Sequence, residues 1–280
     1  MVEPEIPLVP ERFFPGGHSR VRLRVGETVR RTSYSWSPAV LDLLQHLERE
    51  GFAGAPRALG FDDQGREILT YIEGEVGRGD EFIPDQRGRF DLRAPDYVWR
   101  DHVLVHLGAL IRSYHDAAAT FPWVDRQWCF ETRQPVETIC HNELFPQNTV
   151  FRAGVPVALI DWDTATPGPR AWDLGAVAWR WVPFWRDEKC RAHGLPTGVA
   201  EKARRFRLLL DAYGLEPDTG IVRAGIERLS EFLGHQRQFA ADGSEWEVEL
   251  ARRGVLDEAA LEIAWMEQHA AALVSSRVAP

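Results

Sequence analysis

Apolar residues in the first quarter of the chain alternate with polar ones, which is the period-two pattern of half-buried β-strands. In the stretch 20–25 every second residue is valine or leucine, and the residues between them are arginines. Gly26 and Glu27 follow, as expected for a tight hairpin turn. The pattern predicts four strands, at residues 20–25, 28–32, 58–61 and 67–72.

One helix is expected between the second and third of these strands. Ser37 is a residue typical of the N-cap, and Pro38 is favoured at the first helical position. Leucines recur on one face of the segment, and Gly51 predicts its end at about residue 50. The strands and the helix together predict a small sheet with one helix packed on it.

The rest of the chain has a mainly helical pattern. Residues 74–96 are polar and rich in glycine, proline and arginine, which predicts a linker. The region 136–175 has the pattern of short strands and turns, with a strand at 155–160 and a turn at 167–169. Helices are expected at residues 97–119, 199–213, 219–235 and 245–274.

Composition narrows the class of protein. The formal net charge is −9 and no block of basic residues occurs, which argues against nucleic acid or an anionic membrane as partner and is compatible with a cationic small substrate. No apolar run approaches the roughly 18 residues of a membrane span, and the N-terminus lacks the pattern of a secretory signal. Three cysteines without paired spacing indicate reduced thiols, so we expect a cytoplasmic protein.

The densest polar cluster is the segment 141–148, with the sequence HNELFPQN, and two further carboxylates follow at Asp161 and Asp163. Phosphoryl transfer needs a carboxylate that orients the acceptor hydroxyl, and an amide and a carboxylate that hold Mg²⁺ on the phosphates. A hairpin between Asn148 and Asp161 would bring two such magnesium ligands together. The sequence therefore favours phosphoryl-transfer chemistry at these two segments.

The stretches ICHNELFPQNTVF and VALIDWDTATPGPRAWDLG resemble the aminoglycoside phosphotransferase and choline kinase-like family. Its catalytic segment reads His-Gly-Asp, four residues, then Asn, and its metal segment reads Ile-Asp-(Phe/Trp) with a later Tyr/Trp-Asp-Leu. The resemblance implies an α+β, protein-kinase-like fold of two lobes. We expect a small antiparallel-sheet N-lobe with one helix at 1–73, a hinge at about 69–74, and a larger helical C-lobe at 74–280.

The resemblance also implies roles for single residues. His141 supports the catalytic loop, Glu143 stands at the position of the catalytic aspartate, and Asp173 braces the loop. Asn148 and Asp161 are the expected magnesium ligands.

On the nucleotide side, Gly16, Gly17 and Ser19 lie where the family keeps its phosphate-covering loop. The backbone of Tyr71 and Ile72 is expected at the adenine. The cofactors implied are Mg²⁺ and ATP, with GTP as the alternative.

Three positions depart from the family pattern. The base is Glu143 instead of aspartate, and one additional methylene displaces its carboxylate. No lysine occurs before Lys189, so Arg30 or Arg31 would replace the phosphate-binding lysine, and strand alternation leaves both open. The helix that supplies the partner glutamate has Val40 near that turn, with Asp42 as the nearest acid.

The function predicted is an ATP-dependent phosphotransferase that moves the γ-phosphate to a hydroxyl of a small molecule. The alternative is a catalytically degenerate kinase-like protein that binds a nucleotide or a partner without turnover. A metal-dependent hydrolase is disfavoured because no second histidine lies at ligand spacing from His141, and a zinc deaminase because Pro-Cys-x-x-Cys is missing. We interpret Trp179, Trp181 and Trp185 as packing residues in preference to an aromatic cage.

Overall fold

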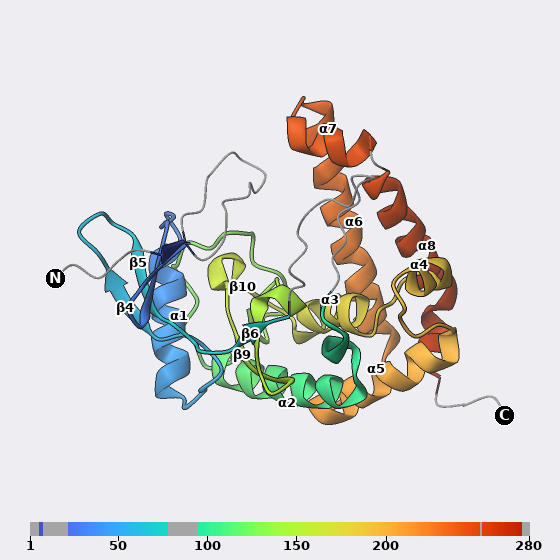
Figure 1. Cartoon of the computed structure of the whole chain (residues 1–280), viewed down its shortest axis with the longest axis horizontal. Helices are drawn as coiled ribbons and strands as arrows, with labels where there is room; N and C mark the ends of the chain where they lie inside the picture. The colour runs from blue at the N-terminus through green and yellow to red at the C-terminus, as the bar shows by residue number, and fades with distance from the viewer. Residues whose placement is uncertain (1–5, 8–21, 78–93, 253, 276–280) are drawn as a thin grey trace.

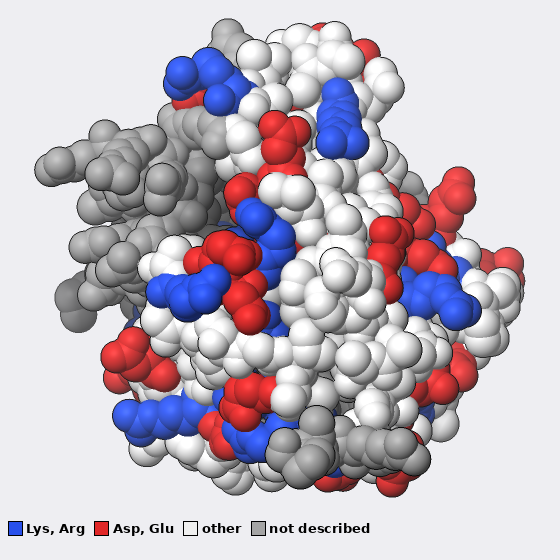
Figure 2. Space-filling model, turned by 90° about the vertical axis from the view of Figure 1, so that its right-hand side faces the viewer, with Lys and Arg blue, Asp and Glu red and all other residues white. Residues whose placement is uncertain are grey.

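A small antiparallel sheet with one helix adjoins a larger, mainly helical part (Figure 1). The computed structural model describes residues 6–7, 22–77, 94–252 and 254–275. In these residues, no helix combines the length and the apolarity that a membrane crossing requires. On the face at the right of Figure 1, acidic and basic side chains are interspersed, and the described residues there form no broad patch of one sign (Figure 2).

The sheet contains five antiparallel strands in the order β1-β2-β3-β5-β4. Their bounds are β1 Ile6–Pro7, β2 Arg22–Val25, β3 Thr28–Arg31, β4 Ala58–Phe61 and β5 Glu67–Thr70. The four strands predicted from the alternating pattern are all present, and among the described residues each has the predicted bounds or ends one or two residues earlier. The register places Arg31 of β3 directly opposite Glu67 of β5. Oppositely charged side chains at directly opposite positions of two antiparallel strands can form an ion pair.

Helix α1, Ser37–Arg49, packs its leucine face into the main core. The prediction that Ser37 caps this helix is wrong, because Trp36 is the N-cap and makes no side-chain cap hydrogen bond. The Ser37 hydroxyl instead accepts a hydrogen bond from the Tyr34 backbone N–H at 2.8 Å and donates one to the buried Glu67 carboxylate. The serine therefore fixes Glu67 to the start of the helix.

Short strands connect the sheet to the helices. A three-stranded sheet contains β6 Glu75–Val76, β8 Thr149–Arg152 and β9 Val155–Leu159, and a separate pair contains β7 Thr138–Cys140 and β10 Thr166–Gly168. The turn expected at 167–169 is therefore wrong, since its first two residues pair with β7. Pro167 is tolerated in β10 because the strand lies at the edge of a two-stranded sheet.

The helical part is built from η1 Asp96–Trp99, α2 Asp101–Ala118, α3 Arg170–Trp181, α4 Asp187–Ala192, α5 Val199–Tyr213, α6 Thr219–Ala241, α7 Glu245–Arg252 and α8 Val255–Leu273. The single helix expected at 97–119 is a 3₁₀ turn followed by α2, separated by the extended residue Arg100. The single helix expected at 245–274 is two helices, because Gly254 has a positive φ of 75° and ends the continuous helical path.

The core of the helical part surrounds aromatic side chains. Trp181 is fully buried and Trp185 is 5% exposed, as the packing interpretation predicted. Trp179 is only partly buried, and its indole N–H donates to the Glu262 carboxylate at 2.7 Å. One of the three tryptophans therefore lies at the boundary between the core and a cleft.

Candidate active site

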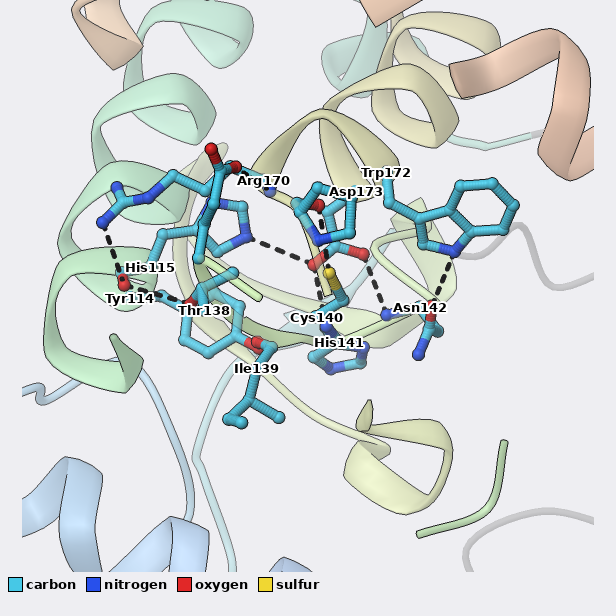
Figure 3. A network of polar contacts seen from close by, with 12 residues as sticks. Tyr114, His115, Thr138, Ile139, Cys140, His141, Asn142, Arg170, Trp172 and Asp173 are labelled. Carbon is cyan, nitrogen blue, oxygen red and sulfur yellow. Dashed lines mark hydrogen bonds and ion pairs between the residues drawn. The ribbon is translucent and has the colours of Figure 1, made fainter. Parts of the chain in front are cut away.

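Strand β7 leads into the segment 141–148, and a carboxylate from α3 fixes the start of that segment. Asp173 accepts hydrogen bonds from the backbone N–H groups of His141 at 2.7 Å and Asn142 at 2.9 Å, and its carboxylate is 3.2 Å from Nε2 of His115 (Figure 3). The Asp173 side chain has no exposed surface. One buried carboxylate thus joins α2, α3 and the segment after β7.

The electrostatics of Asp173 follow from these contacts. Burial by itself would raise the pKa of Asp173, but the hydrogen bond from His115, with the nearby charges of His115 and Arg228, holds the pKa below its usual value. The residue also lies in the first turn of α3, where the helix dipole favours a negative charge. Asp173 is therefore a carboxylate at neutral pH, able to accept both backbone hydrogen bonds.

Asn142 has the left-handed backbone conformation, with φ of 69°. Asparagine is among the few residues other than glycine that adopt this region, and the resembling family has glycine at this position. Its side chain is fixed as well: Nδ2 donates to the carbonyl of Thr164 at 2.6 Å, and Oδ1 accepts from the indole of Trp172 at 3.0 Å. Asn142 therefore adopts the backbone conformation that glycine would allow, and it adds a side chain that glycine lacks.

His141 is buried without exposed surface and links the segment to the end of β9. Nε2 lies 3.1 Å from the carbonyl oxygen of Ile160, and Nδ1 lies 3.3 Å from the backbone nitrogen of Glu143. Burial lowers the pKa of His141 to about 4 despite the charges of Asp173 and Asp161. The ring is therefore neutral at pH 7, donating from Nε2–H to the carbonyl and accepting at Nδ1 from the amide.

The β8–β9 hairpin brings the two expected magnesium ligands to the same end of the small sheet. Thr149 and Leu159 are opposite each other in the register, and the backbone N–H of Ile160 donates to the Asn148 carbonyl at 2.9 Å. Asp161 follows with φ of 70°. The Asn148 amide nitrogen donates to the Glu143 carbonyl at 3.1 Å, which leaves the amide oxygen as its ligand atom.

The donor set fits magnesium in its usual form. Mg²⁺ is commonly bound by one or two protein oxygens, with substrate phosphates and water as the other ligands, and a carboxylate with an amide oxygen supplies such a pair. Among the described residues, no group of three or more His, Cys, Asp or Glu side chains is arranged to hold a metal ion. A magnesium ion at Asn148 and Asp161 would therefore rely on phosphate and water oxygens.

Arg31 of β3 extends from the N-terminal sheet into this region. Its guanidinium is 2.6 Å from Glu67 and 3.4 Å from Asp161, and it also contacts Asp163. Burial would lower the pKa of Arg31, but the charges of Asp163, Glu67 and Asp161 together raise it above the usual value. Arg22 of β2 makes a second ion pair with Asp161 at 2.7 Å.

Arg30 points away from these carboxylates. Its Nε lies 3.7 Å from Asp62, and one Nη donates to the Thr28 hydroxyl at 2.6 Å. Of the two candidates that strand alternation left open, Arg31 is the one that faces Asp161. Asp42, the nearest acid in the helix, forms an ion pair with Arg126 instead.

Glu67 was missed by the sequence reasoning. It is 1% exposed and pairs with Arg31, whereas the family pattern predicts a partner glutamate in the helix. The only sequence signal was its place at the start of a strand, and the register that sets it opposite Arg31 involves residues 36 positions apart. Gly16, Gly17 and Ser19, the expected phosphate-covering loop, lie outside the described residues.

The segment expected to form the hinge leaves the sheet after β5. The backbone N–H of Tyr71 donates to the carbonyl of Glu27 at 2.8 Å, so a backbone contact of Tyr71 with adenine would have to use its carbonyl, and for Tyr71 the expectation stays a proposal. For Ile72 the expectation stands as a proposal. Gly74 has φ of 147°, and a Cβ there would lie 2.5 Å from Val150 and 2.6 Å from the Phe151 carbonyl. Only glycine lets the chain pass this close to β8.

Beside Glu143 a cleft of about 1120 Å³ opens between the segment 129–134, α3 and α6. Glu143 is partly exposed on its wall. Aromatic rings from Phe145, Trp172 and Trp179 line it as well. A cleft of this volume accepts a drug-sized molecule, and Glu143 is one of the residues that line it.

The sequence profile of the phosphotransferase enzyme family matches residues 17–207, a range that begins before β2 and ends within α5. The chain belongs to this family. It is also similar to the trifolitoxin immunity protein of Rhizobium leguminosarum bv. trifolii, with 35% identity over 209 residues, or 71% of this chain and 72% of the relative.

Solved structures of this family share the fold. A spectinomycin phosphotransferase, determined with ADP and spectinomycin, superposes with a TM-score of 0.59 at 10% identity over 95% of this chain and 94% of that one. The macrolide 2′-phosphotransferase of Brachybacterium faecium gives 0.51 at 16% identity over 100% and 94%. The α+β, kinase-like fold predicted from the sequence is therefore confirmed.

Proposed function

We propose that this phosphotransferase family member uses Mg²⁺ and a nucleoside triphosphate, ATP or GTP, to phosphorylate a hydroxyl of a small molecule. The family match supports the reaction class. The observation that carries the proposal is the convergence at Asp161. In the β8–β9 hairpin Ile160, next to Asp161, donates to the Asn148 carbonyl, and the Asn148 amide donates to the Glu143 carbonyl. Arg31 pairs with Asp161 from the N-terminal sheet.

Each side chain has a proposed role. Glu143, exposed to the cleft, orients the acceptor hydroxyl and takes its proton. Asn148 and Asp161 hold the magnesium ion, which when bound neutralises charge on the phosphates. Arg31 contacts the phosphates as the replacement for the family lysine, with Glu67 as its fixed partner. His141 and Asp173 position Glu143 through the loop backbone.

A second candidate is a protein that binds nucleotide without turnover. It is favoured by one observation: Asp161 is engaged by two arginines, Arg22 and Arg31, where a single lysine would leave its carboxylate more available to a metal ion. The two candidates differ in turnover alone.

The test combines nucleotide binding with turnover. Asp161→Asn should abolish the Mg²⁺-dependent part of ATP binding in calorimetry while the protein stays folded, although the loss of two ion pairs can lower its melting temperature. Asp42→Asn, which changes a surface ion pair, should leave binding intact. Unchanged nucleotide affinity in Asp161→Asn would remove the proposed metal site.

Turnover is measured with a panel of hydroxyl acceptors, including antibiotics. Glu143→Gln keeps the shape of the side chain but cannot accept the proton, so the rate of phosphorylation should fall roughly 10²–10⁴-fold. An equally fast Glu143→Gln variant would contradict the base assignment. A wild-type protein that binds Mg²⁺ and ATP but phosphorylates no acceptor would favour the second candidate.

A further inference from the structure

Three arginines line the described part of the cleft beside Glu143: Arg133, Arg180 and Arg228. Two of them already have a carboxylate partner. Arg133 forms an ion pair with Glu231 and lies over the Trp172 ring. Arg228 lies 3.9 Å from Asp173 and 3.3 Å from Oδ1 of Asn142. Both arginines therefore have a carboxylate partner in the protein, although burial still lowers the pKa of Arg228.

Arg180, near the C-terminal end of α3, differs from the other two. Its Nε–H is buried and has no hydrogen-bond acceptor among the described residues. Its guanidinium lies 4.3 Å from the ring centre of Trp179 and 5.0 Å from that of Phe145. Ring faces attract a cation, but they leave the N–H groups at the edge of the guanidinium without an acceptor.

The carboxylate that acts on Arg180 is already used elsewhere. Glu262 accepts a hydrogen bond from the Trp179 indole at 2.7 Å and forms an ion pair with Lys189. Burial lowers the pKa of Arg180 to about 10, and the charge of Glu262 only partly offsets this effect. The side chain is still a cation at neutral pH, but its charge is compensated less than an arginine's usually is.

We propose that the acceptor of this phosphotransferase carries a carboxylate that binds Arg180, which makes Arg180 a determinant of substrate specificity. The inference rests on the proposed function and names its substrate class. A carboxylate accepts two parallel N–H hydrogen bonds from a guanidinium, and so supplies the acceptor that the Nε–H lacks. The apolar body of the molecule would pack on Phe145, Trp172 and Trp179, with its hydroxyl at Glu143.

This substrate class differs from the cationic acceptor with which the negative net charge is compatible. The net charge belongs to the whole surface, whereas the acceptor meets only the walls of the cleft. A cationic group placed beside Arg180 would be repelled by an undercompensated positive charge in a partly desolvated site. The charge at Arg180 therefore favours an anionic group at that point of the cleft, whatever the net charge of the whole surface.

The test uses three probes of one shape and different charge: para-hydroxymethylbenzoate, its neutral amide and the cationic para-hydroxymethylbenzylamine. Binding is measured by calorimetry on the full chain with Mg²⁺ and a non-hydrolysable ATP analogue. We expect the benzoate to bind about tenfold more tightly than the amide or the amine, because only the carboxylate forms charge-assisted hydrogen bonds with the guanidinium.

Variants assign the preference to a residue. Arg180→Gln should reduce the benzoate preference to about twofold or less, and Arg180→Lys should retain part of it, since the charge remains but the planar fork is lost. Arg133→Gln is the matched control, because this arginine is already paired with Glu231, and it should retain the preference.

A wild-type protein that binds the three probes equally, prefers the amine or binds none of them would overturn the proposal. Full preference in Arg180→Gln would also overturn it. Binding of the Mg²⁺-nucleotide complex is recorded in the same experiment. If that binding persists while the charge preference is missing, the acceptor class is wrong and the proposed function stands. If nucleotide binding itself is missing, the proposed function fails.

Discussion

Single residues in unusual backbone conformations mark the candidate site. Among the described residues, four other than glycine have positive φ, and two of them are Asn142 and Asp161. Such conformations cost roughly 1–3 kcal/mol each and persist where the surroundings impose them. Both residues here are held by side-chain contacts, Asn142 to Thr164 and Asp161 to Arg22. Their strain therefore coincides with the positions assigned to the catalytic loop and the metal.

The buried, neutral His141 predicts a pH dependence of stability. Its pKa falls from the ordinary value of 6.5 in the unfolded chain to about 4 in the folded protein. Between these values the unfolded state binds more protons, so the stability that the neutral ring contributes is complete above pH 6.5 and is lost as the pH falls toward 4.

Urea unfolding at pH 7 and pH 5 measures this effect. Wild type should lose about 2 kcal/mol more of its free energy of unfolding over that interval than His141→Gln. His102, exposed on α2, is the control position, and His102→Gln should retain the wild-type loss. Equal losses in wild type and His141→Gln would mean that His141 is protonated in the folded state.

At the level of elements, local patterns were sufficient where the signal was local. The strand β4 and the helix α5 have the predicted bounds, because alternation and a terminal Gly214 are properties of adjacent residues. The failures are elements whose ends depend on distant contacts. Ser37 is the first residue of α1 instead of its N-cap, and its hydroxyl donates to Glu67. The last helix is divided at Gly254, although the apolar periodicity continues past this residue.

The packing of α3 on α6 depends on two glycines that face each other. A Cβ on Gly175 would lie 2.3 Å from the Gly225 backbone nitrogen and 2.7 Å from the Ile221 carbonyl. Gly175→Ala would force apart the two helices that carry Asp173 and Arg228. We expect the free energy of unfolding to fall by about 1–3 kcal/mol or more, measured by urea denaturation.

Gly234 in the same helix α6 is the matched control. A Cβ there would meet no atom within 4 Å, and alanine has a higher helix propensity than glycine by about 1 kcal/mol. Gly234→Ala should therefore leave stability unchanged or raise it slightly. A Gly175→Ala variant as stable as Gly234→Ala would show that the α3–α6 contact is looser than the structure describes.

For the whole molecule, the contacts that could not be predicted from the sequence are those between the N-terminal sheet and the helical part. The segments 141–148 and 160–163 could be selected as a candidate site because each polar pattern lies within a few adjacent residues. The partner of Arg31 could not, because it depends on strand register and on the approach of the sheet to the β8–β9 hairpin. Trp36 adds another such contact, donating to the Asp163 carbonyl at 2.8 Å.

This approach of the two parts yields a prediction about nucleotide binding. If Arg31 contacts the phosphates, Arg31→Gln should weaken ATP binding roughly tenfold or more. The binding of adenosine should be nearly unchanged, because adenosine has no phosphate for Arg31 to contact. Arg30→Gln is the natural control, because Arg30 differs by one position but is directed toward Asp62. It should bind both ligands like wild type.

Calorimetric titration of ATP and adenosine into both variants decides between the two arginines. The melting temperature of each variant must be measured too, because Arg31→Gln leaves Glu67 and Asp163 with less compensation in a buried site. If Arg31→Gln folds and weakens ATP and adenosine equally, Arg31 only organises the carboxylates. A selective loss for ATP would instead mean that one arginine both ties the sheet to Asp161 and recognises the phosphates.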